Sequence, residues 1–202
     1  MDRAGLVTGR AREVATLLVT FGLSFVVVAV GFGDWRFGLG FVLLILVHEL
    51  GHIVEAKRNG LDVSLPVFIP LFGAFVTYRH SGLAPWRTAL ISLAGPLAGG
   101  IGAAVAWEAG SAYTSHWLVY LAYLGFLFNA ANLLPVGFLD GGGAFRGIAS
   151  TWSRPAIRYE NGVPVAASAP ERGRAVQVAV LYVLLAAGLV AGTIATRHSG
   201  AF

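Results

Sequence analysis

The pattern His48-Glu49-Leu50-Gly51-His52 contains the residues whose types and spacing most clearly allow chemistry in this sequence. In a helix, side chains four residues apart lie on one face, so the two histidines can chelate one metal ion. Glu49 is adjacent to the first histidine, where its carboxylate can act as an acid/base on a water molecule that the metal activates. These five residues therefore predict a metal site with hydrolytic chemistry.

Two histidines do not complete such a site, because a catalytic zinc ion usually has three protein ligands and one open position. The chain has no cysteine, so the third ligand has to be a nitrogen or oxygen donor. Glu55 lies seven residues from His48, about 10 Å along a helix axis, and an ion pair with Lys57 or Arg58 explains it more simply. We expect Asp140 to be the third ligand, with a carboxylate at an interfacial helix boundary as the alternative.

The composition around these residues is that of a membrane protein. Hydrophobic residues make up 56% of the chain, charged residues make up 12%, and the mean hydropathy is +0.73. A helix needs about 20 apolar residues to cross the hydrocarbon core. Five windows approach that length: 15–33, 37–54, 88–107, 117–139 and 175–196. We expect an all-α membrane protein, a polytopic bundle of about five transmembrane helices.

The charged cluster in the second window supports a metal site, because ionisable groups inside a span need a compensating charge. His48 and His52 precede Lys57 by nine and five residues, and Asp140 precedes Arg146 by six. In two helices that both run toward the cytoplasm, these spacings bring the three groups to one level.

The basic residues also set the expected orientation, since Lys and Arg accumulate in cytoplasmic loops. We predict a multi-pass protein of the cell (inner) membrane, with its N-terminus and active site toward the cytoplasm. The pI of about 9.9 follows from this bias, and we expect no nucleic-acid partner.

Two segments between the windows do not fit simple helices. Residues 61–78 combine prolines with β-branched and aromatic residues, which predicts an extended or re-entrant segment. The polar segment 150–173 contains the turn signal Asn161-Gly162 and predicts a cytoplasmic loop with a small hairpin. We therefore divide the chain into a membrane-embedded core, a loop and a C-terminal transmembrane helix, which cover residues 1–149, 150–173 and 174–202.

The sequence resembles the site-2 proteases, which are intramembrane zinc metalloproteases. The resemblance rests on HELGH at 48–52 and on NLLPVGFLDGG at 132–142. More loosely, it includes Ala94-Gly95-Pro96 and FIPLFGAF at 68–75. The two main motifs lie in different windows and in the family's order, which makes the signal specific.

The resemblance implies that His48, His52 and Asp140 bind one Zn²⁺ ion and that Glu49 is the catalytic acid/base. The implied activity is that of an intramembrane metalloendopeptidase acting in regulated intramembrane proteolysis. Its expected partners are the lipid bilayer and a membrane-protein substrate helix.

The resemblance also implies residues that bind substrate. Asn132 matches an asparagine thought to hold the substrate or its reacting carbonyl. The stretch 68–76, which includes Gly73 and Phe75, looks like an extended element that contacts substrate. Apart from the resemblance, we expect that an unwound substrate can add to the extended segment 65–76 as a β-strand. The chain departs from the family after Pro135, where many members have a second proline two or three residues later.

Two other classes of function fit the same residues. An ion transporter could use buried histidines and carboxylates as a relay, and a catalytically silent scaffold could keep the fold alone. Gly95 and Gly99, in the third window, fit close helix packing better than catalysis.

Overall fold

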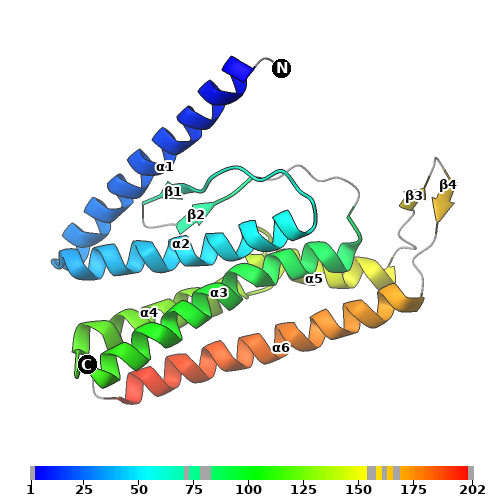
Figure 1. The fold of residues 1–202 in the computed structure, drawn as a ribbon. Helices are drawn as coiled ribbons and strands as arrows, with labels where there is room; N and C mark the ends of the chain where they lie inside the picture. Colours follow the sequence, from blue (N-terminus) through cyan, green and yellow to red (C-terminus); the bar gives the residue numbers. More distant parts are fainter. Residues whose placement is uncertain are drawn as a thin grey trace.

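The computed structural model describes residues 3–70, 73–77, 83–153, 158–160, 163–165 and 169–199. Within these ranges the chain is mainly helical (Figure 1). The helices are α1 (Arg3–Phe32), α2 (Trp35–Arg58), α3 (Pro85–Ala112), α4 (His116–Asn132), α5 (Asp140–Ser153) and α6 (Ala169–His198). The strands are β1 (Val67–Ile69), β2 (Gly73–Phe75), β3 (Arg158–Glu160) and β4 (Val163–Val165). The expected all-α class is confirmed.

Four described helices are long and apolar enough to cross a membrane: Gly9–Phe32, Trp35–Arg58, Pro85–Ala112 and Glu171–His198. The fifth expected window, 117–139, is different. Its helix, α4, has 17 residues and is about 25 Å long, and it ends at Asn132. Pro135 accounts for this end, because proline lacks a backbone N–H and disfavours helical backbone before it. The remainder of the window is a turn at residues 133–139 that leads into α5.

The bundle is arranged around α3, which contacts α2, α4, α5 and α6. Helices α2 and α4 run in one direction and α3 and α6 in the other (Figure 1). The buried side chains Leu93, Phe126 and Leu189 belong to one apolar core cluster shared by α3, α4 and α6. The parallel direction expected for the two helices that lead to the site is thus observed.

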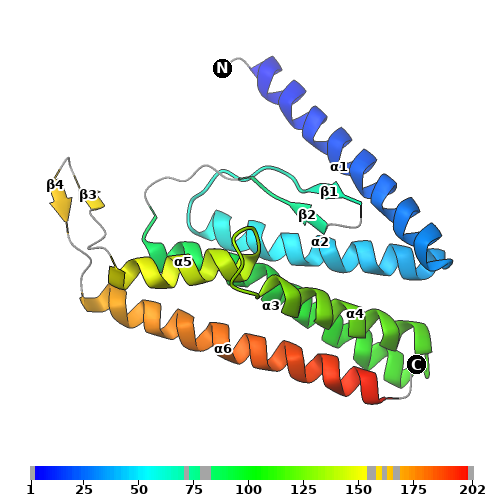
Figure 2. The same cartoon turned by 180° about the vertical axis from the view of Figure 1, so that it is seen from behind.

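Helix α1 slants away from α2, and the β1–β2 hairpin lies between them (Figures 1 and 2). Phe68 of β1 is buried and its ring meets that of Phe21 on α1 edge to face. The Phe68 N–H donates to the hydroxyl of Thr20 on α1 over 3.2 Å. The extended segment predicted from the sequence is confirmed for residues 61–70 and 73–77, whereas 71, 72 and 78 lie outside the described residues. Helix α1 satisfies part of its backbone, as a segment away from water requires.

The second hairpin, β3–β4, pairs Arg158 with Val165 and Glu160 with Val163. It confirms the hairpin expected in the polar segment, although Asn161 and Gly162 lie outside the described residues. Helix α5 continues to Ser153 and α6 begins at Ala169, so helix occupies both ends of the segment 150–173.

Candidate metal centre

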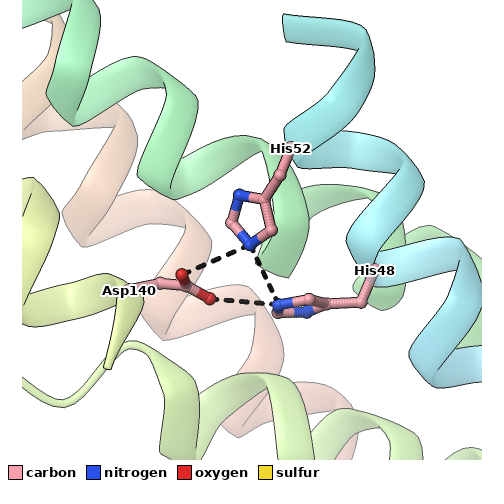
Figure 3. A group of neighbouring side chains, drawn as sticks. All are labelled: His48, His52 and Asp140. Atoms are coloured by element: carbon pink, nitrogen blue, oxygen red, sulfur yellow. Dashed lines mark hydrogen bonds and ion pairs between the residues drawn. The ribbon is translucent and has the colours of Figure 1, made fainter. Parts of the chain in front are cut away.

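Three side chains converge where α2 passes the start of α5 (Figure 3). Histidines 48 and 52 lie one turn apart on α2, and their Nε2 atoms are 3.1 Å apart. Asp140 is the first residue of α5, and its carboxylate faces both rings. Its Oδ2 lies 3.0 Å from Nε2 of His48, and its Oδ1 lies 3.2 Å from Nε2 of His52. The structure thus brings together the three residues that the sequence proposed as ligands.

The outer nitrogen of each ring determines which nitrogen carries the hydrogen. Nδ1 of His52 lies 2.9 Å from the carbonyl oxygen of Ile91, which can only accept, so Nδ1 donates. Nδ1 of His48 lies 2.8 Å from Oδ1 of Asn129. Because the Asn129 amide nitrogen donates to the Gly125 carbonyl, its oxygen is the atom left to accept from His48. In the neutral form of each ring, Nε2 therefore presents a lone pair to the centre.

This donor set fits a zinc ion. Both histidines are buried, and in their neutral form two nitrogen lone pairs face a carboxylate over 3.0 and 3.2 Å. Such atoms repel one another unless positive charge lies between them. In a tetrahedral site with zinc bonds of about 2.05 Å, ligand atoms are about 3.3 Å apart. The observed separations of 3.0 to 3.2 Å are close to that value.

The turn before Asp140 is held at two of its carbonyl groups. The Leu133 carbonyl, freed because α4 ends, accepts from the hydroxyl of Tyr182 on α6. The Gly137 carbonyl accepts from Nη1 of Arg146 on α5 over 2.9 Å. Figure 2 shows this turn reaching toward α2 from the α4–α5 junction. The contacts fix the path by which α5 begins beside the two histidines.

The glycines after Asp140 are required by close backbone approach. A Cβ on Gly141 would overlap the Leu133 carbonyl, and one on Gly142 would overlap the Val136 carbonyl. Asp140 thereby stands in the first turn of a helix, where the helix dipole favours a carboxylate. The expected window 117–139 is thus interrupted at residues 133–139, directly before Asp140.

A cavity of about 470 Å³ opens on the three convergent side chains. Glu49 also lines it and is 4% exposed. Across the described part of the chain, its carboxylate has no hydrogen bond or ion pair with another residue. A buried carboxylate of this kind is available to a water molecule or a substrate in the cavity.

The residues predicted to bind substrate border the same cavity. Asn132 lines it, and its amide nitrogen donates to the Phe128 carbonyl over 3.1 Å. Gly73 and Phe75 line it from β2. The alternative ligand Glu55 lies elsewhere, because its carboxylate is 3.7 Å from Arg58 and accepts from Asn59.

The structure adds Ala74, which the sequence did not single out. Phe68 and Ala74 are opposed in the antiparallel β1–β2 pair. Opposed residues point their backbone groups both toward each other or both away. Since the Phe68 N–H points to Thr20, the Ala74 backbone N–H and C=O point away from β1. Ala74 lines the cavity, so this edge of β2 faces the cavity.

Asn129 is the other residue that sequence reasoning missed. Its signal was available, because it is a polar residue within the apolar stretch Leu124-Gly-Phe-Leu-Phe128 and Ala130-Ala131. It is 1% exposed, and a buried amide in a membrane helix needs partners. The partner, on another helix, could not be read from the sequence.

A family model matches the part of the chain that carries the two histidines, and two curated proteins are similar to the chain. Residues 36–113 match the model of peptidase family M50. The chain is 28% identical to the probable chloroplastic zinc metalloprotease EGY2 of Arabidopsis thaliana, over 61% of this chain and 30% of that protein. It is 29% identical to the probable chloroplastic zinc metalloprotease EGY1 of the same plant, over 54% of this chain and 28% of that protein.

The matches confirm the resemblance to the site-2 protease family. The alignments with the two plant proteins cover about 30% of the length of each of those proteins. The residues matched by the family model include His48, Glu49 and His52 and end before Asp140. Together with the four apolar helices of spanning length, they identify an integral membrane protein.

Proposed function

Because the chain resembles peptidase family M50 over the helix that carries HELGH, we propose that it is an intramembrane zinc metalloendopeptidase. The observation that carries the proposal is that two buried histidines, His48 and His52, and the half-buried Asp140 point their acceptor atoms at one another, beside a Glu49 carboxylate with no bonded partner in the described part of the chain. These residues would hold one Zn²⁺ ion. A bound zinc ion lowers the pKa of a coordinated water and polarises a carbonyl group.

The chain's own acid/base group in this mechanism is Glu49. It borders the cavity next to the histidines, and no side chain in the described structure competes for its carboxylate. Glu49 accepts a proton from the water that attacks the substrate carbonyl, then donates it to the departing amine. This role requires Glu49 to stay buried near the reacting atoms, which its 4% exposure satisfies.

The substrate in this proposal is a peptide segment unwound from a membrane-spanning helix, because helical hydrogen bonds otherwise protect its carbonyls. The free edge of β2 gives the unwound segment a partner for its backbone. The outward backbone groups of Ala74 would form these bonds, while Gly73, Phe75 and Asn132 form the cavity surface around the substrate. Strand addition would also align the substrate along the cavity.

The proposal includes an orientation. With the N-terminus in the cytoplasm, the end of α2 at Lys57 and Arg58 lies on the cytoplasmic side. The centre is then reached from the cytoplasmic half of the membrane. The lipid bilayer and the substrate helix are the partners that this arrangement requires.

The experiment that tests the function compares wild type with Glu49→Gln in liposomes that contain a candidate membrane substrate. We expect wild type to release a cleaved product and Glu49→Gln to lose about 10²- to 10⁴-fold in rate while it retains zinc. Zinc retention separates loss of the acid/base from loss of the site.

The same liposomes distinguish the two other classes of function. A transporter would show metal or proton flux without a peptide product. A silent scaffold would bind zinc or substrate without cleavage by wild type. Cleavage that is unchanged in Glu49→Gln would contradict the proposed mechanism.

A further inference from the structure

Asn129 is buried at 1% exposure in the middle of an otherwise apolar helix, and both of its polar groups have partners. Its amide nitrogen donates to the Gly125 carbonyl over 2.7 Å within α4. Its Oδ1 is 2.8 Å from Nδ1 of His48, on a helix 81 residues away in sequence. The amide therefore links α4 directly to one of the candidate ligands.

We infer that Asn129 is a positioning residue that fixes the His48 ring with its Nε2 lone pair toward the metal, an inference that rests on the proposed zinc site. Oδ1 of Asn129 can accept a hydrogen bond but cannot donate one. The contact therefore selects the form of His48 in which Nδ1 carries the hydrogen. The same contact prevents rotation of the ring away from Asp140. Outer hydrogen bonds of this kind generally orient histidine ligands and raise their basicity.

The third helix is shaped to allow this contact. A Cβ on Gly99 would overlap both polar atoms of the Asn129 amide. One turn earlier on α3, a Cβ on Gly95 would overlap the imidazole of His52. The sequence predicted that these two glycines serve close helix packing, whereas the space they leave is occupied by side chains of the site. Gly99 is therefore part of what positions Asn129.

Two substitutions at Asn129 separate positioning from packing. Asn129→Leu keeps the number and branching of the side-chain heavy atoms but removes the acceptor. Asn129→Asp keeps an acceptor oxygen for His48 but places a charge in the bundle. Packing alone predicts that leucine is tolerated better than aspartate, because burying a carboxylate is costly. Positioning predicts the reverse order for zinc affinity.

The measurement is the dissociation constant for Zn²⁺, determined by competition with a chelator in detergent. We expect binding about 10- to 100-fold weaker in Asn129→Leu and in Gly99→Ala, and near wild type in Asn129→Asp. Gly102→Ala is the matched control on α3, because its Cβ would meet only the ends of the Leu44 and Val47 side chains. It should bind zinc as wild type does.

A second readout needs no metal. Histidine ¹⁵N spectra of the zinc-free protein should show His48 with its hydrogen on Nδ1 in wild type and in Gly102→Ala, and a mixture of forms in Asn129→Leu. Wild-type zinc affinity together with an unchanged His48 spectrum in Asn129→Leu would overturn the inference. A wild-type protein that binds no zinc would instead contradict the proposed function, so the two failures are distinguishable.

Discussion

His48 and His52 each direct their N–H group to an acceptor outside the centre, Asn129 for one and the Ile91 carbonyl for the other. When both rings are neutral, the inner face of the centre consists of acceptor atoms. This arrangement leaves both Nε2 atoms free to bind a cation together with Asp140. The chemical character of the candidate site thus depends on residues outside the proposed ligand set.

The assignment of Asp140 as the third ligand can be tested with two isosteric substitutions. Asp140→Asn removes the charge that faces both rings, so we expect zinc affinity to fall by more than the about 10- to 100-fold typical of an outer partner. Glu55→Gln should leave zinc affinity unchanged, because Glu55 pairs with Arg58 instead. The reverse pattern in a chelator competition would make Glu55 the ligand.

The residues that could be predicted from the sequence are those whose spacing within one helix has chemical meaning. The i, i+4 histidines and Glu49 belong to this group, since one helix places all three. Asn129 contacts His48, which lies 81 residues away in sequence, and Ala74 is opposed to Phe68 across the hairpin. Only the packing of α4 on α2 and the register of the β1–β2 hairpin reveal them.

Among the elements, the break between α4 and α5 was only partly predictable. Pro135 and the glycines after Asp140 indicated an interrupted helix. They did not show that Asp140 begins a new helix, because this depends on the bonds from Tyr182 and Arg146 to the turn. Distant residues therefore determine the start of α5.

The close approach of α5 to this turn predicts a local sensitivity to side-chain volume. Gly141→Ala should destabilise the protein by about 1–3 kcal/mol and weaken zinc binding, because the added Cβ pushes α5 away from the Leu133 carbonyl. Gly137→Ala, in the same turn, is the control, since nothing lies within 4 Å of its Cβ position. Thermal unfolding and zinc titration of both variants provide the comparison, and equal behaviour would contradict this account of the turn.

Substitutions at Ala74 in the β1–β2 hairpin test whether the backbone of β2 binds substrate. Ala74→Pro removes the backbone N–H that points away from β1, and proline is tolerated at such an edge position. We expect kcat/KM to fall about tenfold, as loss of one backbone hydrogen bond to substrate would predict. Ala74→Val adds similar volume and keeps the N–H, so it should cleave faster than the proline variant. Equal cleavage by both would count against strand addition.

For the whole molecule, the proposed orientation places the two ends of the bundle in different compartments. The chain has no cysteine, so a single introduced cysteine reports accessibility without background. Lys57→Cys should react with a membrane-impermeant maleimide only from the cytoplasmic side. Tyr113 follows the last residue of α3, at the end of the bundle opposite to Lys57, and is 79% exposed. Tyr113→Cys should therefore react only from the other side of the membrane. Labelling with the two sides exchanged would reverse the proposed topology.

The packing of the bundle holds α2 and the start of α5 next to each other. Helix α3 contacts both elements and provides the Ile91 carbonyl for His52. Helix α6 holds the turn before Asp140 through Tyr182. The candidate metal centre thus lies where several of the described helices pack together.

X-ray absorption at the zinc edge of the purified wild-type protein tests the central claim most directly. We expect about one zinc ion per chain, with two imidazole nitrogens at about 2.0–2.1 Å and at least one oxygen at about 2.0–2.2 Å from the metal. A protein that carries no stoichiometric zinc, or a zinc ion without two imidazole ligands, would contradict it.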